Sequence, residues 1–319
     1  MKSKILLGIG LVVGLILVVI LSVFFYISGK GIPSYEVKLP DYTVKSSPEA
    51  IERGKKLALM LCAGCHMNRE TGKLTGTQML DAPAEFGPIY SRNITQDKNY
   101  GIGNWTDAEL LYLLRTGIKK DGQYVPPYMA KLTNMADEDV NAIIAFLRSD
   151  EALVAADPTP DKDSDPSFLT KLLSNLAWKP MPMPTEVIPM PDTADQVQLG
   201  KYLAYNLECF SCHSADFKTN DFMNPDQSKG YFGGGNQTLN LKGQIVATAN
   251  LTPHETGIGN WSQEDFVKAV KFGLVPNDRA LRYPMHPYTQ LSDYEAASIY
   301  EYLMTIPPID NKVERVFYD

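Results

Sequence analysis

The chain has 319 residues, with 30 lysines and arginines against 37 aspartates and glutamates, so its formal net charge is −7. This balance argues against a nucleic-acid partner, which would require a basic face opposite the phosphates. The four cysteines fall in two Cys-x-x-Cys pairs, which makes these pairs the first candidates for chemistry.

The chain begins with an apolar segment. Residues 5–27 carry no charge and would form a helix about 35 Å long, enough to cross a bilayer core. A cleaved signal peptide would have a shorter apolar region followed by small residues, whereas residues 24–26 are all aromatic. Lys2 and Lys4 precede the segment and favour a cytoplasmic N-terminus. We therefore predict one transmembrane anchor at residues 1–30 in the cytoplasmic (inner) membrane, with the rest of the chain facing the periplasm.

After a linker at residues 31–47, a helix expected at 48–61 runs into the motif Cys62-Ala-Gly-Cys65-His66. A redox dithiol does not need a histidine directly after its second cysteine. A single zinc site made from both Cys-x-x-Cys pairs would leave the adjacent histidines without a role. Cys-x-x-Cys-His is instead the attachment signature of c-type haem, in which the cysteines form thioethers and the histidine binds the iron.

A second copy of this motif, Cys209-Phe-Ser-Cys212-His213, follows a helix expected at 194–208. We therefore predict two covalently bound haem c groups. The predicted haem attachment residues are Cys62, Cys65, Cys209 and Cys212. The predicted iron ligands are His66 and His213.

An internal repeat indicates the same fold in both halves. The stretch "GIGNWTDAELLYLLRTG" (101–117) reappears as "GIGNWSQEDFVKAVKFG" (257–273). In each copy a serine or threonine follows the tryptophan, and an acid comes three positions later. This spacing is the capping box that starts a helix. A third helix is expected at 137–148 and again at 293–304, and nothing in the pattern indicates strands.

The same repeat selects two methionines. Methionine is the usual sixth iron ligand in electron-carrying cytochromes c. At the offset of the repeat, Met129 aligns with Met285. Met135 is the rival in the first copy, but it aligns with Leu291, which favours a core position for it. We predict Met129 and Met285 as the sixth ligands.

Between the two halves, residues 151–193 carry eight prolines, which favour an extended and semi-rigid chain. "SFLTKLLSNLAW" (167–178) interrupts them as a short amphipathic helix. The segment is either a linker strapped across both domains or a partner-docking or membrane-surface element. The predicted fold is all-α, with an N-terminal transmembrane helix followed by two tandem helical domains at 48–150 and 194–308 and a tail at 309–319.

The two Cys-x-x-Cys-His motifs, the "N-[IL]-T…G-I-G-N-W" stretches and the late acidic helix resemble membrane-associated multihaem cytochromes c of bacterial respiratory chains. They are most similar to the cytochrome subunits that accept electrons from periplasmic alcohol and sugar-acid dehydrogenases. The resemblance implies class I-like cytochrome c domains and a respiratory complex, a periplasmic dehydrogenase or other redox proteins as partners. Those subunits carry three haems and lack a plain N-terminal anchor of this kind, and here this chain departs from them.

Four further residues are expected near the haems. Trp105 and Trp261 hold matching repeat positions and are expected to pack beside the haem, although a core role is equally compatible. Asn93 and Asn250 are expected to form hydrogen bonds within the haem pocket.

The function expected from these features is electron transfer without substrate chemistry, so the chain is not expected to be an enzyme. A membrane-anchored dihaem cytochrome c would relay single electrons between a dehydrogenase or quinol-oxidising complex and a terminal acceptor. Two alternatives remain, the haem c subunit of a terminal oxidase and a dihaem peroxidase. The peroxidase is disfavoured because both domains carry a methionine at equivalent positions.

Overall fold

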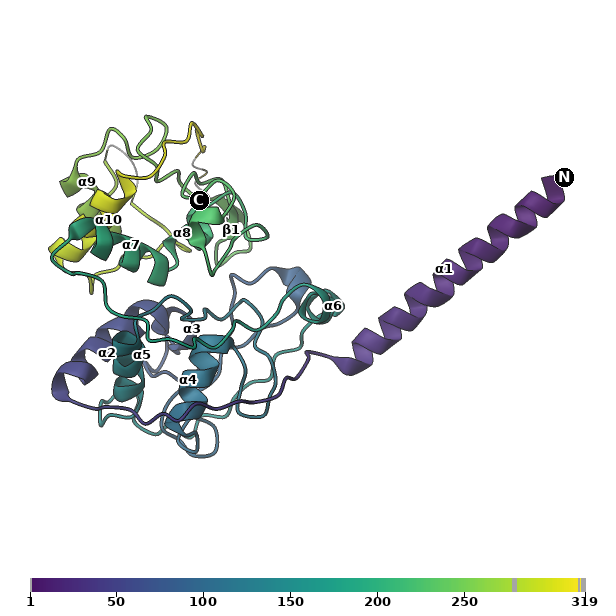
Figure 1. Cartoon of the computed structure of the whole chain (residues 1–319), viewed down its shortest axis with the longest axis horizontal. Helices are drawn as coiled ribbons and strands as arrows, with labels where there is room; N and C mark the ends of the chain where they lie inside the picture. Colours follow the sequence, from purple (N-terminus) through teal and green to yellow (C-terminus); the bar gives the residue numbers. More distant parts are fainter. Residues whose placement is uncertain (1, 277–279, 315, 317–319) are drawn as a thin grey trace.

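The computed structural model describes residues 2–276, 280–314 and 316. Two helical lobes lie side by side, and a long helix, α1 (Lys2–Lys30), projects from one of them (Figure 1). An 18-residue window within the span Lys4–Lys30 has a mean hydropathy of 3.1. An apolar N-terminal helix is therefore confirmed, and by length and composition it suits a membrane span or a signal sequence equally.

The first lobe is built around α2 to α5 and the second around α7 to α10, with α6 in the segment between them. The helices expected in the lobes and the linker are all present, and their ends agree with the expected ranges to within two residues. The elements are α2 (Pro48–Leu61), α3 (Ala63–His66), η1 (Ala84–Phe86), α4 (Asp107–Thr116), α5 (Asp137–Leu147), α6 (Phe168–Leu176), α7 (Gln196–Asn206), α8 (Cys209–His213), η2 (Pro225–Gln227), β1 (Gln237–Leu239), β2 (Ile245–Ala247), α9 (Gln263–Phe272) and α10 (Asp293–Leu303).

The first and last helices of each lobe cross at a glycine. A Cβ added to Gly54 of α2 would lie 1.8 Å from the carbonyl oxygen of Ala142 in α5. A Cβ added to Gly200 of α7 would likewise lie 1.8 Å from the carbonyl oxygen of Ser298 in α10. Because the neighbouring atoms are backbone, no larger residue fits without moving a helix. The same crossing in both lobes shows that the sequence repeat is also a structural repeat.

The helices after the two tryptophans begin at the predicted capping boxes. The Thr106 hydroxyl accepts the Glu109 N–H at 3.2 Å, and the Glu109 carboxylate accepts the Thr106 N–H at 2.7 Å. Ser262 and Asp265 exchange the equivalent bonds at 3.1 and 3.0 Å. These bonds satisfy the free N–H groups of the first turn. They fix where each helix starts relative to the tryptophan before it.

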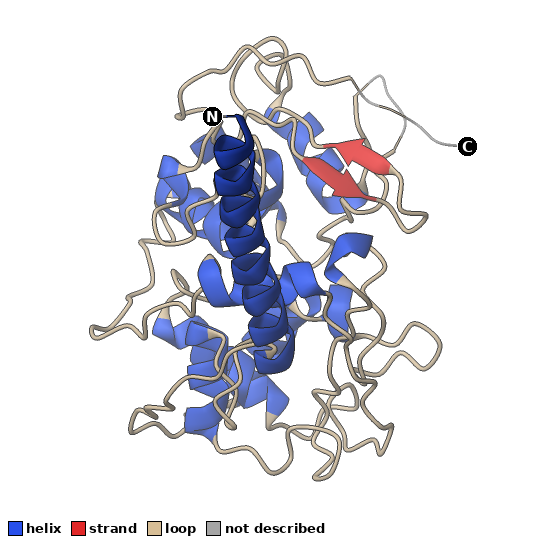
Figure 2. Cartoon of the chain, turned by 90° about the vertical axis from the view of Figure 1, so that its right-hand side faces the viewer, coloured by secondary structure: helices blue, strands red, loops and turns tan. Residues whose placement is uncertain are grey.

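The expectation that strands are absent was wrong in the second lobe. β1 and β2 form a two-stranded antiparallel hairpin, shown in red in Figure 2, with Thr238 opposite Val246. Asn240 shapes the turn, because its side-chain oxygen accepts the N–H groups of Lys242 and Gln244 at 2.9 Å each. Strands of three residues are too short to show an alternating pattern.

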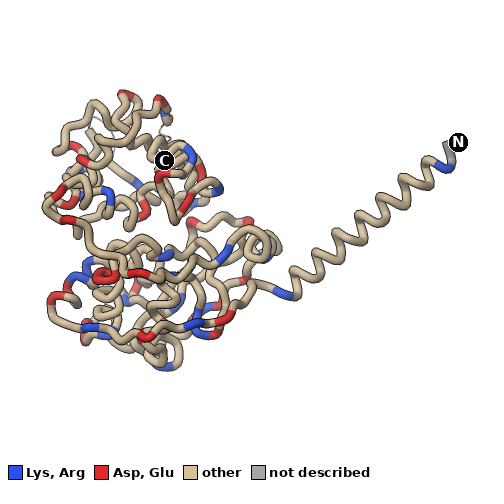
Figure 3. Tube along the Cα trace, in the orientation of Figure 1, with Lys and Arg blue, Asp and Glu red and all other residues tan. Residues whose placement is uncertain are grey.

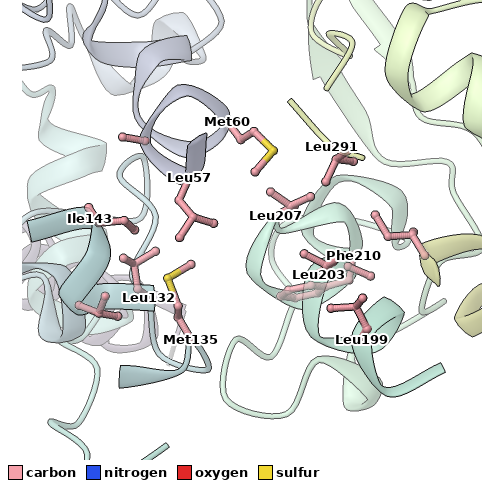
Figure 4. Close-up of a cluster of buried hydrophobic side chains, with 14 of the residues drawn as sticks. Leu57, Met60, Leu132, Met135, Ile143, Leu199, Leu203, Leu207, Phe210 and Leu291 are labelled. Atoms are coloured by element: carbon pink, nitrogen blue, oxygen red, sulfur yellow. The ribbon is translucent and has the colours of Figure 1, made fainter. Parts of the chain in front are cut away.

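Side chains join the two lobes directly. The Tyr202 hydroxyl of α7 donates to Asp139 of α5 at 2.5 Å, and the same carboxylate accepts a bond from Arg53. Lys56 of α2 pairs with Glu295 of α10 at 2.5 Å. The buried apolar residues of both lobes form one cluster, whose members face one another across the boundary in Figure 4. The lobes are therefore held at a fixed separation.

The proline-rich segment follows the surface of the first lobe. The N–H of Asp165 donates to Pro88 O at 2.9 Å, and that of Ser167 donates to Phe86 O at 2.9 Å. Further along, the Met181 N–H donates to Thr116 O at 3.1 Å. The segment is thus strapped to the first lobe at these residues, and its role as a linker or as a docking element stays a prediction.

Candidate haem sites

Each Cys-x-x-Cys-His motif forms a single helical turn. Cys62 caps the end of α2, and its N–H donates to Ala58 O at 2.8 Å before α3 begins. α8 carries the second motif from Cys209 to His213. Residues three and four apart lie on one face of a helix, so each turn presents its cysteines and its histidine together. All four cysteines are free thiols.

Both motif histidines are oriented by a backbone carbonyl. His66 Nδ1 lies 2.7 Å from Arg92 O, and His213 Nδ1 lies 2.8 Å from Ala249 O. A carbonyl can only accept, so Nδ1 carries the proton and Nε2 keeps its lone pair. Burial lowers the pKa of both imidazoles and keeps them neutral. A neutral ring with a fixed Nδ1–H and a free Nε2 is the form that binds a metal.

One cavity joins the two motifs. Its volume is about 2120 Å³, roughly twice the upper end of the 300–1,000 Å³ range of ordinary ligand pockets. Both motifs lie in its wall, together with apolar side chains of both lobes. These include Ile102, Leu110, Leu132 and Ile143 of the first lobe and Ile258, Phe266, Val270 and Ile299 of the second. Its size, its apolar walls and the cysteines in its wall fit two large flat macrocycles.

Both methionines selected by the repeat line this cavity. Met129 and Met285 are half-buried in its wall. Met135 is completely buried and belongs to the apolar core instead, where Figure 4 shows it beside Leu132. Further methionines, among them Met60, also line the cavity, but they have no repeat partner. The structure thus places Met129 and Met285 in the wall of the cavity that contains both motifs, and their role as iron ligands stays a prediction.

Lys131 was not anticipated and holds the methionine loop. Its ammonium donates to Met129 O and Pro126 O, both at 2.7 Å. Burial lowers the pKa of this amine to about 7, while burial raises the pKa of Glu208, in the second lobe, to about 7. Nothing in the repeat points to Lys131, because its partners are backbone carbonyls.

The two asparagines line the cavity, but the hydrogen bonds that the structure shows run elsewhere. Asn93 Nδ2 donates to the carbonyls of Asp157 and Thr159 at 3.0 Å each. Asn250 Nδ2 donates to the carbonyl of Ile309 at 2.8 Å. Each asparagine therefore ties down the chain that follows the last helix of its lobe. A bond from either one to a haem stays a prediction.

The two tryptophans also line the cavity. The Lys120 ammonium lies 5.2 Å from the centroid of the Trp105 ring. The Trp261 carbonyl accepts the Tyr300 hydroxyl at 2.7 Å. Their positions suit packing beside a haem, which stays a prediction.

The two alternatives to haem attachment, a redox dithiol and a shared zinc site, find little support. Burial raises the pKa of the Cys62 and Cys209 thiols to about 12, whereas a reactive dithiol has a lowered thiol pKa. Within residues 2–276, 280–314 and 316, no three histidine, cysteine or acidic side chains come together as a metal site. A shared four-cysteine zinc site is therefore not formed there.

Taken together, the fold and the paired sites define a c-type cytochrome. Residues 51–150 match the family model described as "Cytochrome c". Residues 51–150 therefore belong to the cytochrome c family, as the first sequence motif predicted. A cytochrome c domain carries electrons, in line with the expectation that the chain is an electron-transfer protein. Haem c is thereby supported as its cofactor, and the two motifs indicate two of them.

Three relatives illustrate the likeness. The fructose dehydrogenase cytochrome subunit of Gluconobacter japonicus is 30% identical over 81% of this chain and 53% of its own length. The alcohol dehydrogenase (quinone) cytochrome c subunit of Gluconacetobacter polyoxogenes is 28% identical over 81% of this chain and 56% of its own length. A diheme cytochrome c-type protein of Cereibacter sphaeroides is 28% identical over 84% of this chain and 92% of its own length. The chain thus spans about half the length of the two dehydrogenase subunits.

Proposed function

We propose that this chain is a membrane-anchored dihaem cytochrome c that relays single electrons in a bacterial respiratory chain. It would pass them between a dehydrogenase or quinol-oxidising complex and a terminal acceptor. The observation that carries the proposal is the pair of equivalent sites, each with an oriented histidine and a repeat-matched methionine, in the wall of one cavity.

The second lobe is proposed to be a class I-like cytochrome c domain like the first, although the family match covers residues 51–150 alone. Both lobes cross their first and last helices at a glycine and place the motif at the end of the first helix. The proposed boundaries are those expected from the sequence, 48–150 and 194–308.

Each lobe would hold its haem by the same set of groups. The two cysteines would attach the macrocycle, Nε2 of the histidine would bind one face of the iron, and the methionine sulfur would bind the other. Haem c supplies a one-electron couple when bound. The chain's own part is to orient the histidine through its carbonyl partner, so that Nε2 is free, and to hold the Met129 loop through Lys131.

The relay is supported by the way the lobes are joined. Both sites open into the same cavity, and the pairs Lys56–Glu295 and Tyr202–Asp139 cross the boundary. A fixed distance between two redox centres lets an electron move between them without a domain motion.

The proposed anchor is α1, retained in the mature protein with the body in the periplasm. Its last turns pack on the body, because Ile27 is buried and the Phe24 ring lies 4.7 Å from the Phe168 ring of α6. The Asn175 amide also donates to Gly31 O at 2.9 Å. Cleavage after the apolar segment would remove these contacts and expose the surface beneath them.

The partner is proposed from the relatives, two of which are named as cytochrome subunits of fructose and alcohol dehydrogenases. A periplasmic dehydrogenase or another membrane-bound respiratory complex would occupy that place here. A subunit of a terminal oxidase would perform the same relay and is the second candidate. A dihaem peroxidase fits less well, since both sites have a methionine in the cavity wall.

Purification from native membranes in mild detergent tests this assignment. We expect the chain to stay with the membrane after an alkaline carbonate wash and to copurify with a dehydrogenase or quinol-oxidising complex. Copurification with oxidase subunits would favour the second candidate. Recovery of the chain only as a free, water-soluble monomer would contradict both the anchor and the partner.

A further inference from the structure

The short helix α6 is amphipathic in the opposite sense to an ordinary surface helix. Its small polar residues face the protein, because Thr170 and Ser174 are completely buried and the Thr170 hydroxyl donates to Phe86 O at 2.9 Å. On its other side, Leu169 and Leu173 line the cavity, and Leu176, which does not line it, is 69% exposed. A helix in water normally buries its apolar face and exposes its polar one. The opposite arrangement requires an apolar surrounding.

The position of α6 relative to α1 says what this surrounding is. The Phe168 ring of α6 packs on Phe24, which lies three residues before the end of the apolar span 5–27. At 1.5 Å per residue this is a depth of about 4.5 Å from that end. Amphipathic helices that lie on membranes bury their apolar face about 5–10 Å into the boundary between headgroups and acyl chains. If α1 crosses the bilayer, α6 is therefore held at this boundary.

The lysines around the junction of α1 and α6 also indicate a membrane surface. Lys30 ends α1, and Lys171 and Lys179 lie on and just beyond α6. In Figure 3, α1 is free of charge between its ends and basic where it meets the body. Lysines beside an apolar face attract the anionic headgroups of phospholipids. This local basic character contrasts with the net charge of −7 of the whole chain.

We propose that α6 lies in the headgroup layer of the membrane, with Leu176 turned to the lipid. The occupant of this face is thus the phospholipid surface itself. The proposal rests on the proposed function in one respect, that α1 stays in the membrane as an anchor.

This arrangement places the first haem site beside the membrane. Leu169, Leu173 and Trp178 also line the cavity, so α6 separates the lipid from the first site. Figure 1 shows α6 on the first lobe, on the side where α1 leaves it. The first haem site is then held next to the bilayer.

Site-directed nitroxide labels test the proposal in the full-length, haem-loaded protein. Leu176→Cys places a label on the face turned to lipid, at a residue that is not among those lining the cavity. Val187→Cys is the matched control, since Val187 lies in the same segment, is 78% exposed, and precedes Ile188, which bonds to Asp137 at the start of α5. The label is attached after haem loading, when the four native cysteines are expected to be blocked as thioethers.

The measurement is the access of each label to oxygen, which concentrates in lipid, and to a water-soluble nickel chelate. The protein is reconstituted in vesicles of phosphatidylethanolamine and phosphatidylglycerol with no other protein. We expect the oxygen-to-nickel access ratio to be several-fold higher at position 176 than at position 187. The fraction of protein that floats with the vesicles is measured in the same samples.

The outcomes distinguish the contact of α6 with lipid from the membrane anchor α1. Protein that floats with the vesicles while both labels stay equally open to nickel would overturn the lipid contact and leave the anchor intact. Protein that does not float would refute the anchor, and with it the inference. Protection of position 176 only after native membrane proteins are added would show a partner helix on this face and would overturn the lipid proposal.

Discussion

Replacing the methionines one at a time distinguishes the proposed iron ligands from a core residue. Met129 is half-buried in the cavity wall, whereas Met135 is completely buried in the core and is not among the residues that line the cavity. Truncation of a fully buried methionine to alanine costs about 2–5 kcal/mol, a large part of the roughly 5–15 kcal/mol by which a domain is stable. Met135→Ala should therefore lower the free energy of unfolding of the first lobe by about 2–5 kcal/mol and leave the haem spectrum intact.

Met129→Ala should instead change the haem spectrum. As the sixth ligand, its thioether would stabilise reduced iron. Its loss should remove about half of the near-infrared sulfur-to-iron band, lower one of two reduction potentials and let one reduced haem bind carbon monoxide. Absorption spectroscopy, redox titration and denaturant unfolding of both variants measure these effects. Loss of the band in Met135→Ala, with an unchanged band in Met129→Ala, would refute the assignment from the repeat.

Two further predictions concern the scaffold. Gly200→Ala should cost more than the roughly 1–3 kcal/mol of ordinary overpacking, because the new methyl would lie 1.8 Å from the Ser298 carbonyl oxygen. Calorimetry should show a lower midpoint for the second lobe, and an unchanged midpoint would contradict the close crossing of α7 and α10. The second concerns pH: a hydrogen bond from Lys73 at 2.8 Å, with further bonds from Thr159, lowers the pKa of Asp157 to about 2. Its stabilising effect is complete above about pH 4, the ordinary aspartate range, and is lost as pH falls to about 2. Acid unfolding of Asp157→Asn should show a weaker pH dependence in this window than the wild type, and identical curves would contradict the bond.

Local signals in the sequence were sufficient for most helices. Thr106 and Ser262, with an acid three residues later, start α4 and α9, because a capping box acts within a single turn. The repeat offset also separated Met129 from Met135, since equivalent positions in two copies must meet the same surroundings. The hairpin escaped notice, because three-residue strands leave no period to detect.

The features that sequence could not provide depend on backbone groups or on distant segments. The acceptors of the histidine Nδ1–H groups are the carbonyls of Arg92 and Ala249, which any residue type could supply. The single cavity arises only when the lobes dock. The pattern of α6 showed an apolar face, but it could not show that the buried side would be the polar one with Thr170 and Ser174.

The most direct test of the central claim is the covalent haem content of the intact chain. Mass spectrometry of the mature protein should find the mass of the polypeptide plus two haems, and the red colour should survive acid–acetone extraction. The double variant Cys209→Ala/Cys212→Ala should retain one haem in the first lobe, and Cys62→Ala/Cys65→Ala should retain the other. A wild-type protein that contains zinc and no iron, or that loses all its haem to the solvent, would contradict the account.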